Sequence, residues 1–418
     1  MMAALLAAAL WLNLATFAGA PVSTTHSIVG GVMGGGMAAA GFSIVDWGTM
    51  GAIVSSWIIS PLMGGIIAAS FLLAIKKTII FREDKVQASY RWVPIYVAVM
   101  AWAFSTYLVI KGLNQVWGGF VAALNGLPMV TIAPQGKPSF LIAMLIGLMI
   151  GVLVFWIVKK TIGSNLPHMK NDRASVNAQF TIPLIFAAAL LSFAHGANDV
   201  ANAIGPLAAI NDAIMTGGIT SQAGIPIWVM AVGALGIAIG LGLYGPRLIR
   251  TVGGEITELD QMRAYSIAMA ASLTVIIASQ LGLPVSTTHV AIGGVFGVGF
   301  LREWLDESNK IERQIDREKA EIKDDKKMLN ALRNELKKLE KKPSKTVEEY
   351  QRITELFRLI DEEKAELKKA KKLLKKDKKN LFVKRDMVKK IVTAWVITVP
   401  AAATLSACIF FMIKGIML

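Results

Sequence analysis

Long apolar runs alternate along the chain with short polar segments. A bilayer core requires roughly 20 apolar residues per spanning helix. Windows of about this length lie at residues 3–20, 50–75, 93–110, 139–158, 225–246, 264–283 and 391–416. The pattern predicts an all-α, polytopic membrane protein, and we expect it in the cell (inner) membrane.

A further apolar stretch, from about residue 180 to residue 210, contains polar and helix-breaking residues. These are Gly196, Asn198, Asp199, Asn202, Gly205 and Pro206. Backbone freed from a helix at membrane depth is tolerated only where protein or a polar cavity satisfies it. We therefore expect a broken helix.

Charge is concentrated in one part of the chain. Residues 302–390 hold 29 of the 44 Lys and Arg residues and 20 of the 29 Asp and Glu residues. Elsewhere the basic residues gather in the loops at 76–91, 159–173 and 247–263, which predicts that these loops and the charged insert are cytoplasmic. The net charge of +15 then reflects such loops rather than nucleic-acid binding, and the single cysteine excludes an intrachain disulfide.

The sequence contains an internal repeat. The hexapeptide Pro-Val-Ser-Thr-Thr-His occurs at 21–26 and at 284–289, an offset of 263 residues that the Gly-rich segments following it share. The segment at 57–61 resembles that at 395–400 at an offset of 338, because the charged insert lies within the second copy. The loop charges orient these last two helices oppositely, so we expect inverted repeats, which with broken helices are typical of secondary transporters.

Each hexapeptide is suited to binding an oxyanion. Its proline ends one helix, and its Ser and Thr residues are good N-caps for the next. Such a start presents hydroxyls, free backbone N–H groups and the positive end of a helix dipole. The alternative is a polar helix kink with locally satisfied hydroxyls.

The segment around Asp199 is suited to binding a cation. Asn198 and Asn202 lie one turn apart on a helix face beside Asp199, the only acid deep in an apolar window, where a charge costs roughly 2.5–3.5 kcal/mol or more. Carboxylate and amide oxygens are hard ligands, so Asn198 and Asp199 form a candidate Na+ site, with carbonyls freed at Gly196. A structural Asp that caps a half-helix is the alternative.

The segment Gly-Ala-Asn-Asp-Val-Ala-Asn-Ala-Ile-Gly at 196–205 and the paired hexapeptides resemble the inorganic phosphate transporter (PiT) family, over nearly all the chain except the insert. The resemblance implies inverted repeats that each supply one Asn-Asp segment and one re-entrant Ser-Thr-Thr hairpin. It implies substrate binding by Ser23, Thr24, Thr25, Ser286, Thr287, Thr288 and Asn202, and cation binding by Asn198, Asp199, Thr25 and Thr288. Na+ or H+ is the expected coupling ion, with no cofactor and no catalytic residue.

The chain departs from the family pattern at its start. In the second copy Gly196 precedes Pro284 by 88 residues, so the equivalent segment of the first copy would precede Pro21 by a similar distance. We therefore expect this chain to lack one of the two Asn-Asp segments.

The insert is a second departure. Its apolar residues are spaced for two helical stripes on either side of a turn at Pro343 and Ser344. One stripe is Ile311, Ile315, Ile322, Leu329, Leu332, Leu336 and Leu339, and the other is Val347, Tyr350, Ile353, Leu356, Phe357, Ile360, Leu367 and Leu374. We expect a cytoplasmic, antiparallel coiled-coil hairpin. A solvated strut or a dimer contact is favoured over nucleic-acid binding by the hairpin, because acids interleave with the bases.

The expected organisation has five parts. They are the first-repeat part of the core at 1–92, intervening helices at 93–178, the second-repeat core at 179–301, the hairpin at 302–390 and a last spanning helix at 391–418.

The leading hypothesis is secondary active symport of inorganic phosphate, not enzymatic activity. Transport of another tetrahedral oxyanion, such as sulfate, is the nearest alternative; a protonated phosphate can donate a hydrogen bond to Asp199, which sulfate cannot. An intramembrane hydrolase has no need of duplicated hairpins, and a non-transporting scaffold has no need of Asp199. The expected partners are phosphate, Na+ or H+, the lipid bilayer and, as a homodimer, a second copy of the chain.

Overall fold

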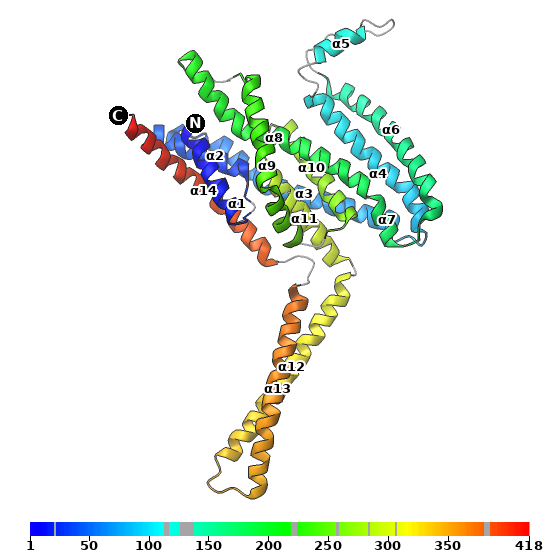
Figure 1. Cartoon of the computed structure of the whole chain (residues 1–418), viewed down its shortest axis with the longest axis vertical. Coiled ribbons are helices and arrows are strands. Elements are labelled where there is room, and N and C mark those ends of the chain that lie inside the picture. The colour runs from blue at the N-terminus through cyan, green and yellow to red at the C-terminus, as the bar shows by residue number, and fades with distance from the viewer. Residues whose placement is uncertain are drawn as a thin grey trace. The chain divides into compact units, whose positions relative to one another are not determined.

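The computed structural model is helical, and none of the residues that it describes lies in a strand (Figure 1). It describes residues 1–417 apart from 21, 113–116, 126–137, 219–223, 256–258, 283–284, 306 and 380–384. The chain forms two compact units, Met1–Val298 with Asp386–Leu418 and Gly299–Arg385. The second unit has nearly the bounds expected for the insert.

The helices of the first unit match the apolar windows of the sequence, except that the window at 3–20 contains only the 16-residue helix α1. Among the described residues, seven helices are long and apolar enough to cross a membrane, namely α3, α4, α6, α8, α9, α10 and α14, and α1 is a shorter apolar helix. The helices are α1 (Met2–Phe17), α2 (Thr24–Ala40), α3 (Trp47–Ile75), α4 (Lys85–Tyr107), α5 (Trp117–Asn125), α6 (Phe140–Asn165), α7 (Arg173–Gln179), α8 (Thr181–Thr216), α9 (Ile227–Glu255), α10 (Gln261–Gln280), α11 (Thr287–Trp304) and α14 (Arg385–Ile416). Short 3-10 turns at Phe42–Ile44 and Leu166–His168 and π-helical turns at Lys76–Ile80 and Leu108–Gly112 complete the set.

The expected break in the helix around Asp199 is wrong. α8 runs without interruption from Thr181 to Thr216, through Gly196 and with Pro206 inside it. A glycine within a helix costs only about 1 kcal/mol, whereas an unpaired backbone group in hydrocarbon costs several kcal/mol. The continuous helix is therefore the favoured state, and the carbonyls around Gly196 are not freed to bind a cation.

The centre of the first unit is α10. In this helix 72% of the apolar window is buried, against 6% for that of α9. Tyr265 and Met269 of α10 pack in a core with Phe180, and the Tyr265 hydroxyl donates a hydrogen bond to the Tyr96 carbonyl at 2.9 Å. The outer helices expose their apolar side chains, which is the pattern of helices that face lipid.

Each copy of the repeat packs against the other copy. A Cβ added to Gly30 in α2 would lie 2.6 Å from the carbonyl oxygen of Val399 in α14, and a Cβ added to Gly293 in α11 would lie 2.1 Å from that of Pro61 in α3. Gly293 is Gly30 shifted by 263 residues, and Val399 is Pro61 shifted by 338. The two contacts are therefore equivalent, and both require a glycine because the two backbones touch.

The same equivalence extends the repeat to α1 and α10. Gly31 lies against the backbone of Ala4 in α1, and Gly294 lies against Ile267 in α10. Both pairs are related by 263 residues, although the sequences of α1 and α10 show little likeness. α2 has 17 residues and α11 has 18, fewer than the roughly 20 that a straight crossing requires. Their expected re-entrant path and the inverted orientation of the copies stay predictions.

Three of the basic loops meet at one face of the unit. The side chain of Asn171 accepts a hydrogen bond from the Lys85 backbone N–H at 2.8 Å and donates one to the Glu83 carbonyl at 2.9 Å. Arg173 forms an ion pair of 3.1 Å with Asp260. The loops before α4, α7 and α10 therefore lie together, as the charge pattern predicts for segments on one side of a membrane.

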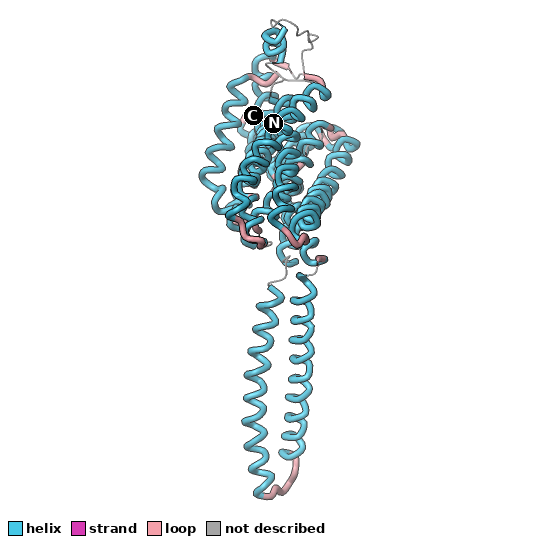
Figure 2. The backbone as a smooth tube through the Cα atoms, turned by 90° about the vertical axis from the view of Figure 1, so that its right-hand side faces the viewer, coloured by secondary structure: helices cyan, strands magenta, loops and turns pink. Residues whose placement is uncertain are grey.

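The second unit contains a hairpin of two long helices, α12 (Glu307–Glu340) and α13 (Val347–Lys379), joined by a turn at Pro343 and Ser344 (Figure 2). The expected stripes form its core, with Ile322, Leu329, Ile360 and Leu367 buried and Leu332, Leu336 and Leu374 packed on them. Leu356 is also buried, whereas Val347, Tyr350 and Phe357 are exposed, so their assignment to the stripe is wrong. Val347 begins its helix, and Phe357 points away because its neighbour Leu356 occupies the core. The side chains of Ile311 and Ile315 lie outside the described residues.

Candidate functional site

Asp199 joins the two hexapeptides. It lies midway along α8, and its residue is only 7% exposed. The Thr24 hydroxyl donates a hydrogen bond to its Oδ2 at 2.7 Å, and the Thr287 hydroxyl donates one to its Oδ1 at 3.3 Å. Thr24 and Thr287 are equivalent positions of the two copies, so one carboxylate binds the same hydroxyl of each repeat with a different oxygen.

Local capping places these hydroxyls. The Oγ of Ser23 accepts a hydrogen bond from the His26 backbone N–H at 3.2 Å, and the Oγ of Ser286 accepts one from the His289 N–H at 3.2 Å. Each serine thus caps its helix, and the threonine after it is the first helical residue. The N-termini of α2 and α11, the positive ends of two helix dipoles, therefore converge on Asp199.

The two asparagines of α8 extend the site on the same helix face, as their spacing predicts. The Asn198 side-chain amide donates hydrogen bonds to Asp199 Oδ1 and to the Val285 carbonyl, both at 3.0 Å. The Asn202 amide donates to the Thr25 hydroxyl at 3.1 Å, and that hydroxyl donates to the Val285 carbonyl at 3.4 Å. The Val285 carbonyl is therefore a shared acceptor, which no sequence pattern indicated.

His195 is a further member of the site that the sequence interpretation left without a role. Its Nδ1 is hydrogen-bonded to the Thr287 hydroxyl, and its Nε2 lies 3.7 Å from Asp199 Oδ2. The sequence could have placed His195 beside Asp199, because residues four apart on a helix lie on one face. The 3.7 Å contact is an ion pair only when both ring nitrogens of His195 are protonated, which gives the imidazolium its positive charge.

The structure brings together most, but not all, of the residues expected at the site. Asp199, Asn198, Asn202 and the threonines Thr24, Thr25 and Thr287 form one network of hydrogen bonds, and Ser23 and Ser286 act through their caps. Thr288 is half-buried at the second position of α11. None of the described hydrogen bonds joins Thr288 to this network, so its binding roles stay predictions.

A cluster of aromatic rings, which begins at His26 and His289 beside the site, also follows the repeat. The centroid of the His26 ring lies 3.7 Å from that of the Trp57 ring, and the centroid of the His289 ring lies 3.6 Å from that of the Trp395 ring. The two histidines contact each other edge to face at 4.3 Å. Trp57 and Trp395 are equivalent at the offset of 338, so each copy supplies one histidine and one tryptophan. The contact between the two histidines joins the copies.

The chemistry of the site is that of hard oxygen atoms. The Asp199 carboxylate, the threonine hydroxyls and the Val285 carbonyl lie in one network, into which Asn198 and Asn202 donate amide N–H groups. Oxygen ligands of this kind suit Na+ rather than a transition metal. Among the described residues, no group of three or more His, Cys, Asp or Glu side chains could hold a metal ion. The described ion pairs give Asp199 no Lys or Arg partner.

Comparison with known proteins shows the family of the chain. Residues 1–406 match the profile of the "Phosphate transporter family". The chain belongs to this family. It is therefore an integral, multi-pass membrane protein, in keeping with the seven described helices that are long and apolar enough to cross a membrane.

Relatives in the family cover most of the chain. A protein of Helicobacter pylori named "Putative phosphate permease" is 48% identical over 98% of this chain and 74% of its own length. A Thermococcus kodakarensis protein with the same description is 41% identical over 72% of this chain and 68% of its own length. A solved structure, "The sodium-dependent phosphate transporter", superposes with a TM-score of 0.71 and 28% identity, over 99% of this chain and 79% of that one. These similarities support a role in phosphate transport.

Proposed function

We propose that the chain is a secondary active symporter that carries inorganic phosphate together with Na+. The observation that carries the proposal is the buried Asp199 carboxylate, bound by Thr24 and Thr287 at two helix N-termini. A buried charge is costly unless it is paired, and here no fixed Lys or Arg is paired with it among the described residues. A mobile cation would supply the missing charge, and the similarity to a sodium-dependent transporter favours Na+ over H+.

The same contacts suggest how cation and anion binding are coupled. While Asp199 is unoccupied, the hydroxyls of Thr24 and Thr287 donate to it and cannot donate to a substrate. An anion at about 4 Å from that carboxylate would meet a repulsion of about 4 kcal/mol at an effective dielectric constant of 20. Na+ bound to Asp199, Asn198 and Thr25 removes this repulsion and lets both hydroxyls turn toward phosphate. Cation binding therefore precedes anion binding.

Phosphate suits the site better than sulfate. Both anions accept hydrogen bonds from hydroxyls and from the free N–H groups of a helix N-terminus. Only a protonated phosphate can also donate a hydrogen bond, and an oxygen of Asp199 is the available acceptor. Leaving such an acceptor unpaired costs about 1–3 kcal/mol, which disfavours sulfate.

The reciprocal packing of the copies suits alternating access. α2 packs on α14 and α11 on α3 through equivalent glycines, so two similar bodies meet at Asp199. We propose that the copies are inverted, that α2 and α11 are re-entrant, and that rocking of one copy against the other exposes the site to each side in turn. An enzyme would not need the duplication, and a scaffold would not need the buried carboxylate.

Uptake into proteoliposomes tests the proposal. Purified full-length chain is reconstituted, and uptake of labelled phosphate is measured with an imposed Na+ gradient, with an imposed H+ gradient and with neither. We expect uptake driven by Na+, competition by excess phosphate and little competition by sulfate. Uptake driven only by H+ would refute the choice of cation, equal competition by sulfate would refute the choice of anion, and no uptake under any gradient would refute symport.

A matched control separates the site from general effects of substitution. Thr274 is a buried threonine of α10 whose hydroxyl donates to the Ala270 carbonyl of its own helix at 2.8 Å. Thr274→Val should leave uptake close to that of the parent chain. Thr24→Val changes the same side chain at the site and should lower it.

A further inference from the structure

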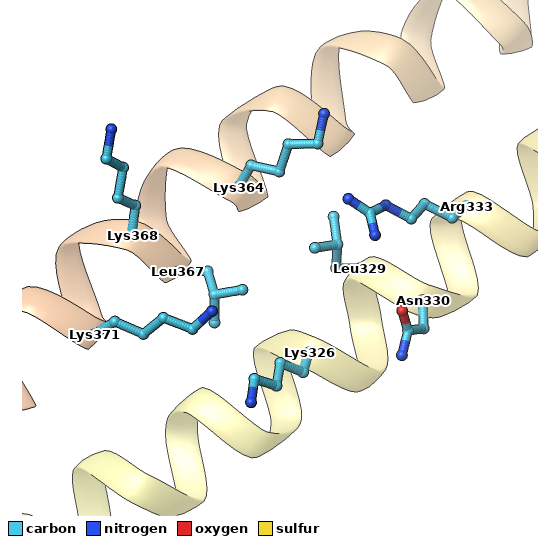
Figure 3. Close-up of a pocket in the computed structure, with 8 residues that line it drawn as sticks. All are labelled: Lys326, Leu329, Asn330, Arg333, Lys364, Leu367, Lys368 and Lys371. Carbon is cyan, nitrogen blue, oxygen red and sulfur yellow. The ribbon is translucent and has the colours of Figure 1, made fainter.

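The hairpin holds a basic cleft that plays no part in the transport site. The cleft has a volume of about 450 Å³ and lies between α12 and α13. It is lined by Lys326, Leu329, Asn330, Arg333, Lys364, Leu367, Lys368 and Lys371 (Figure 3). No acidic residue belongs to this lining.

The cations of the cleft are largely uncompensated. Within the part of the chain that the structure describes, an ion pair engages only Lys364 among them, at 3.2 Å from Asp361. Arg333 from α12 and Lys371 from α13 point into the gap between the helices (Figure 3). The floor is apolar, because Leu329 and Leu367 are 6% and 7% exposed. Several positive side chains thus line one recess and repel one another, and a multivalent anion bound there would relieve this repulsion.

Helical geometry separates charges that interleave in the sequence. Lys326 and Arg333 lie seven residues apart on one flank of the core residue Leu329, and Lys364 and Lys371 lie likewise beside Leu367. The acids Asp325, Glu363 and Glu366 gather elsewhere on the hairpin, where burial and then the charges of Asp325 and Glu366 raise the pKa of Glu363. Acids and bases that interleave in the sequence therefore lie on different parts of the hairpin around this cleft.

We infer that this cleft is a binding site for a soluble anion that carries two or more phosphate groups, of the size of a nucleotide. Its volume is within the range of about 300–1,000 Å³ that is typical of small-molecule sites. Arg and Lys side chains supply the charge and the hydrogen-bond donors that phosphate groups require. The two leucines offer contact area to an uncharged part of the ligand.

A recess favours a free molecule over a membrane surface. A bilayer presents its anionic headgroups on a plane, so it would contact projecting lysines and not a floor between two helices.

Binding to the full-length protein in detergent tests the site. The probes are ATP, inorganic tripolyphosphate, orthophosphate, and vesicles of phosphatidylcholine with and without phosphatidylglycerol. We expect binding of ATP and tripolyphosphate, with that of ATP tighter if the apolar floor contributes. Orthophosphate is tested in buffer without Na+, in which the transport site should take up no anion on the proposed order of binding, and there it should bind weakly. Raising the ionic strength should weaken binding, because exposed charges are screened.

A triple variant and a matched control locate the site. Lys326→Gln, Arg333→Gln and Lys371→Gln together should weaken binding of both polyphosphates by roughly 10- to 100-fold, as expected for three exposed charge contacts. The control, Lys338→Gln, Lys341→Gln and Lys369→Gln, removes three charges from exposed positions outside the cleft and should leave affinity within about twofold. Glutamine preserves helix propensity, so both variants should keep the parent circular dichroism.

Two further measurements make each result decisive. Binding should survive Lys326→Arg and Lys371→Arg, which keep the charge. It should also survive Asp199→Asn, so failure of the proposed transport function and failure of this inference are distinguishable. Equal loss in the triple variant and its control, binding to the anionic vesicles alone, no binding of either polyphosphate at millimolar concentration, or occupation of the cleft by a second copy in sedimentation experiments would each overturn the inference.

Discussion

The two threonines that bind Asp199 should make unequal contributions to phosphate affinity. Hydrogen bonds to charged groups contribute about 1.5–3 kcal/mol, or roughly 10- to 150-fold in affinity at 1.4 kcal/mol per tenfold. Among the described hydrogen bonds the Thr24 hydroxyl has only Asp199 as its partner and is free to turn once Na+ binds, whereas the Thr287 hydroxyl is also held by His195. We therefore expect Thr24→Val to weaken phosphate binding toward the upper end of this range, and Thr287→Val toward the lower end.

Thr24→Val should affect Na+ binding in the direction opposite to its effect on phosphate binding. Valine at position 24 removes a donor that stabilises the empty Asp199 carboxylate. The half-saturating Na+ concentration should therefore stay the same or fall, while the phosphate concentration for half-maximal uptake rises. Because both hydroxyls bind one carboxylate, the double variant should deviate from additivity by about 0.5–3 kcal/mol.

The assay is initial phosphate uptake into proteoliposomes, measured over a matrix of phosphate and Na+ concentrations for both single variants, the double variant and Thr274→Val. Unchanged phosphate affinity in both single variants would show that the hydroxyls are structural. A parallel rise in the Na+ requirement of Thr24→Val would refute the assignment of this residue to the anion, and a comparable loss in Thr274→Val would show that the effect is not specific to the site.

Three other perturbations follow from the contacts. Asp199→Asn should abolish cation-dependent uptake without loss of membrane insertion, because the neutral amide cannot neutralise Na+; parental cation dependence in that variant would contradict the ligand assignment. Gly30→Ala should lower the thermal stability of the purified protein by about 1–3 kcal/mol, since the new Cβ would lie 2.6 Å from the Val399 carbonyl oxygen. Gly36→Ala, whose Cβ would meet only Ile44 at 3.6 Å, should be neutral or stabilising, and equal effects would refute the close packing of α2 on α14. Replacement of residues 307–379 by a short flexible linker should preserve uptake, because the first copy joins its equivalent elements without such an insert; loss of uptake with normal insertion would show that the hairpin takes part in transport.

Several features were determined by the sequence alone because they depend on local properties. The positions of the spans follow from the length of apolar runs, which the thickness of the bilayer prescribes. The hairpin follows from apolar residues at helical spacing around Pro343 and Ser344. The caps of α2 and α11 follow from a serine three residues before the histidine whose N–H it accepts. The resemblance of the motifs added the family, and with it the residues that we expect at the site.

Other features were decided only by the tertiary structure. Asp199 meets Thr24 across 175 residues of chain and Thr287 across 88, and no spacing rule relates such distant positions. No spacing rule predicts either that a helix of one copy packs on a helix of the other, as α2 does on α14 where Gly30 meets Val399. The Val285 carbonyl carries no sequence signal at all, because every residue has one.

The errors of the sequence interpretation share a physical cause. Gly196 and Pro206 were expected to break α8, but local propensities of about 1–3 kcal/mol are outweighed where an unsatisfied backbone would face hydrocarbon. Val347, Tyr350 and Phe357 were expected in the apolar stripe of the hairpin but are exposed, because the pairing of the two helices decides which apolar residues meet the partner helix. Sequence order determines which groups are present, whereas the environment that each group meets is a property of packing, where contacts between distant segments compete with local preferences and exceed them.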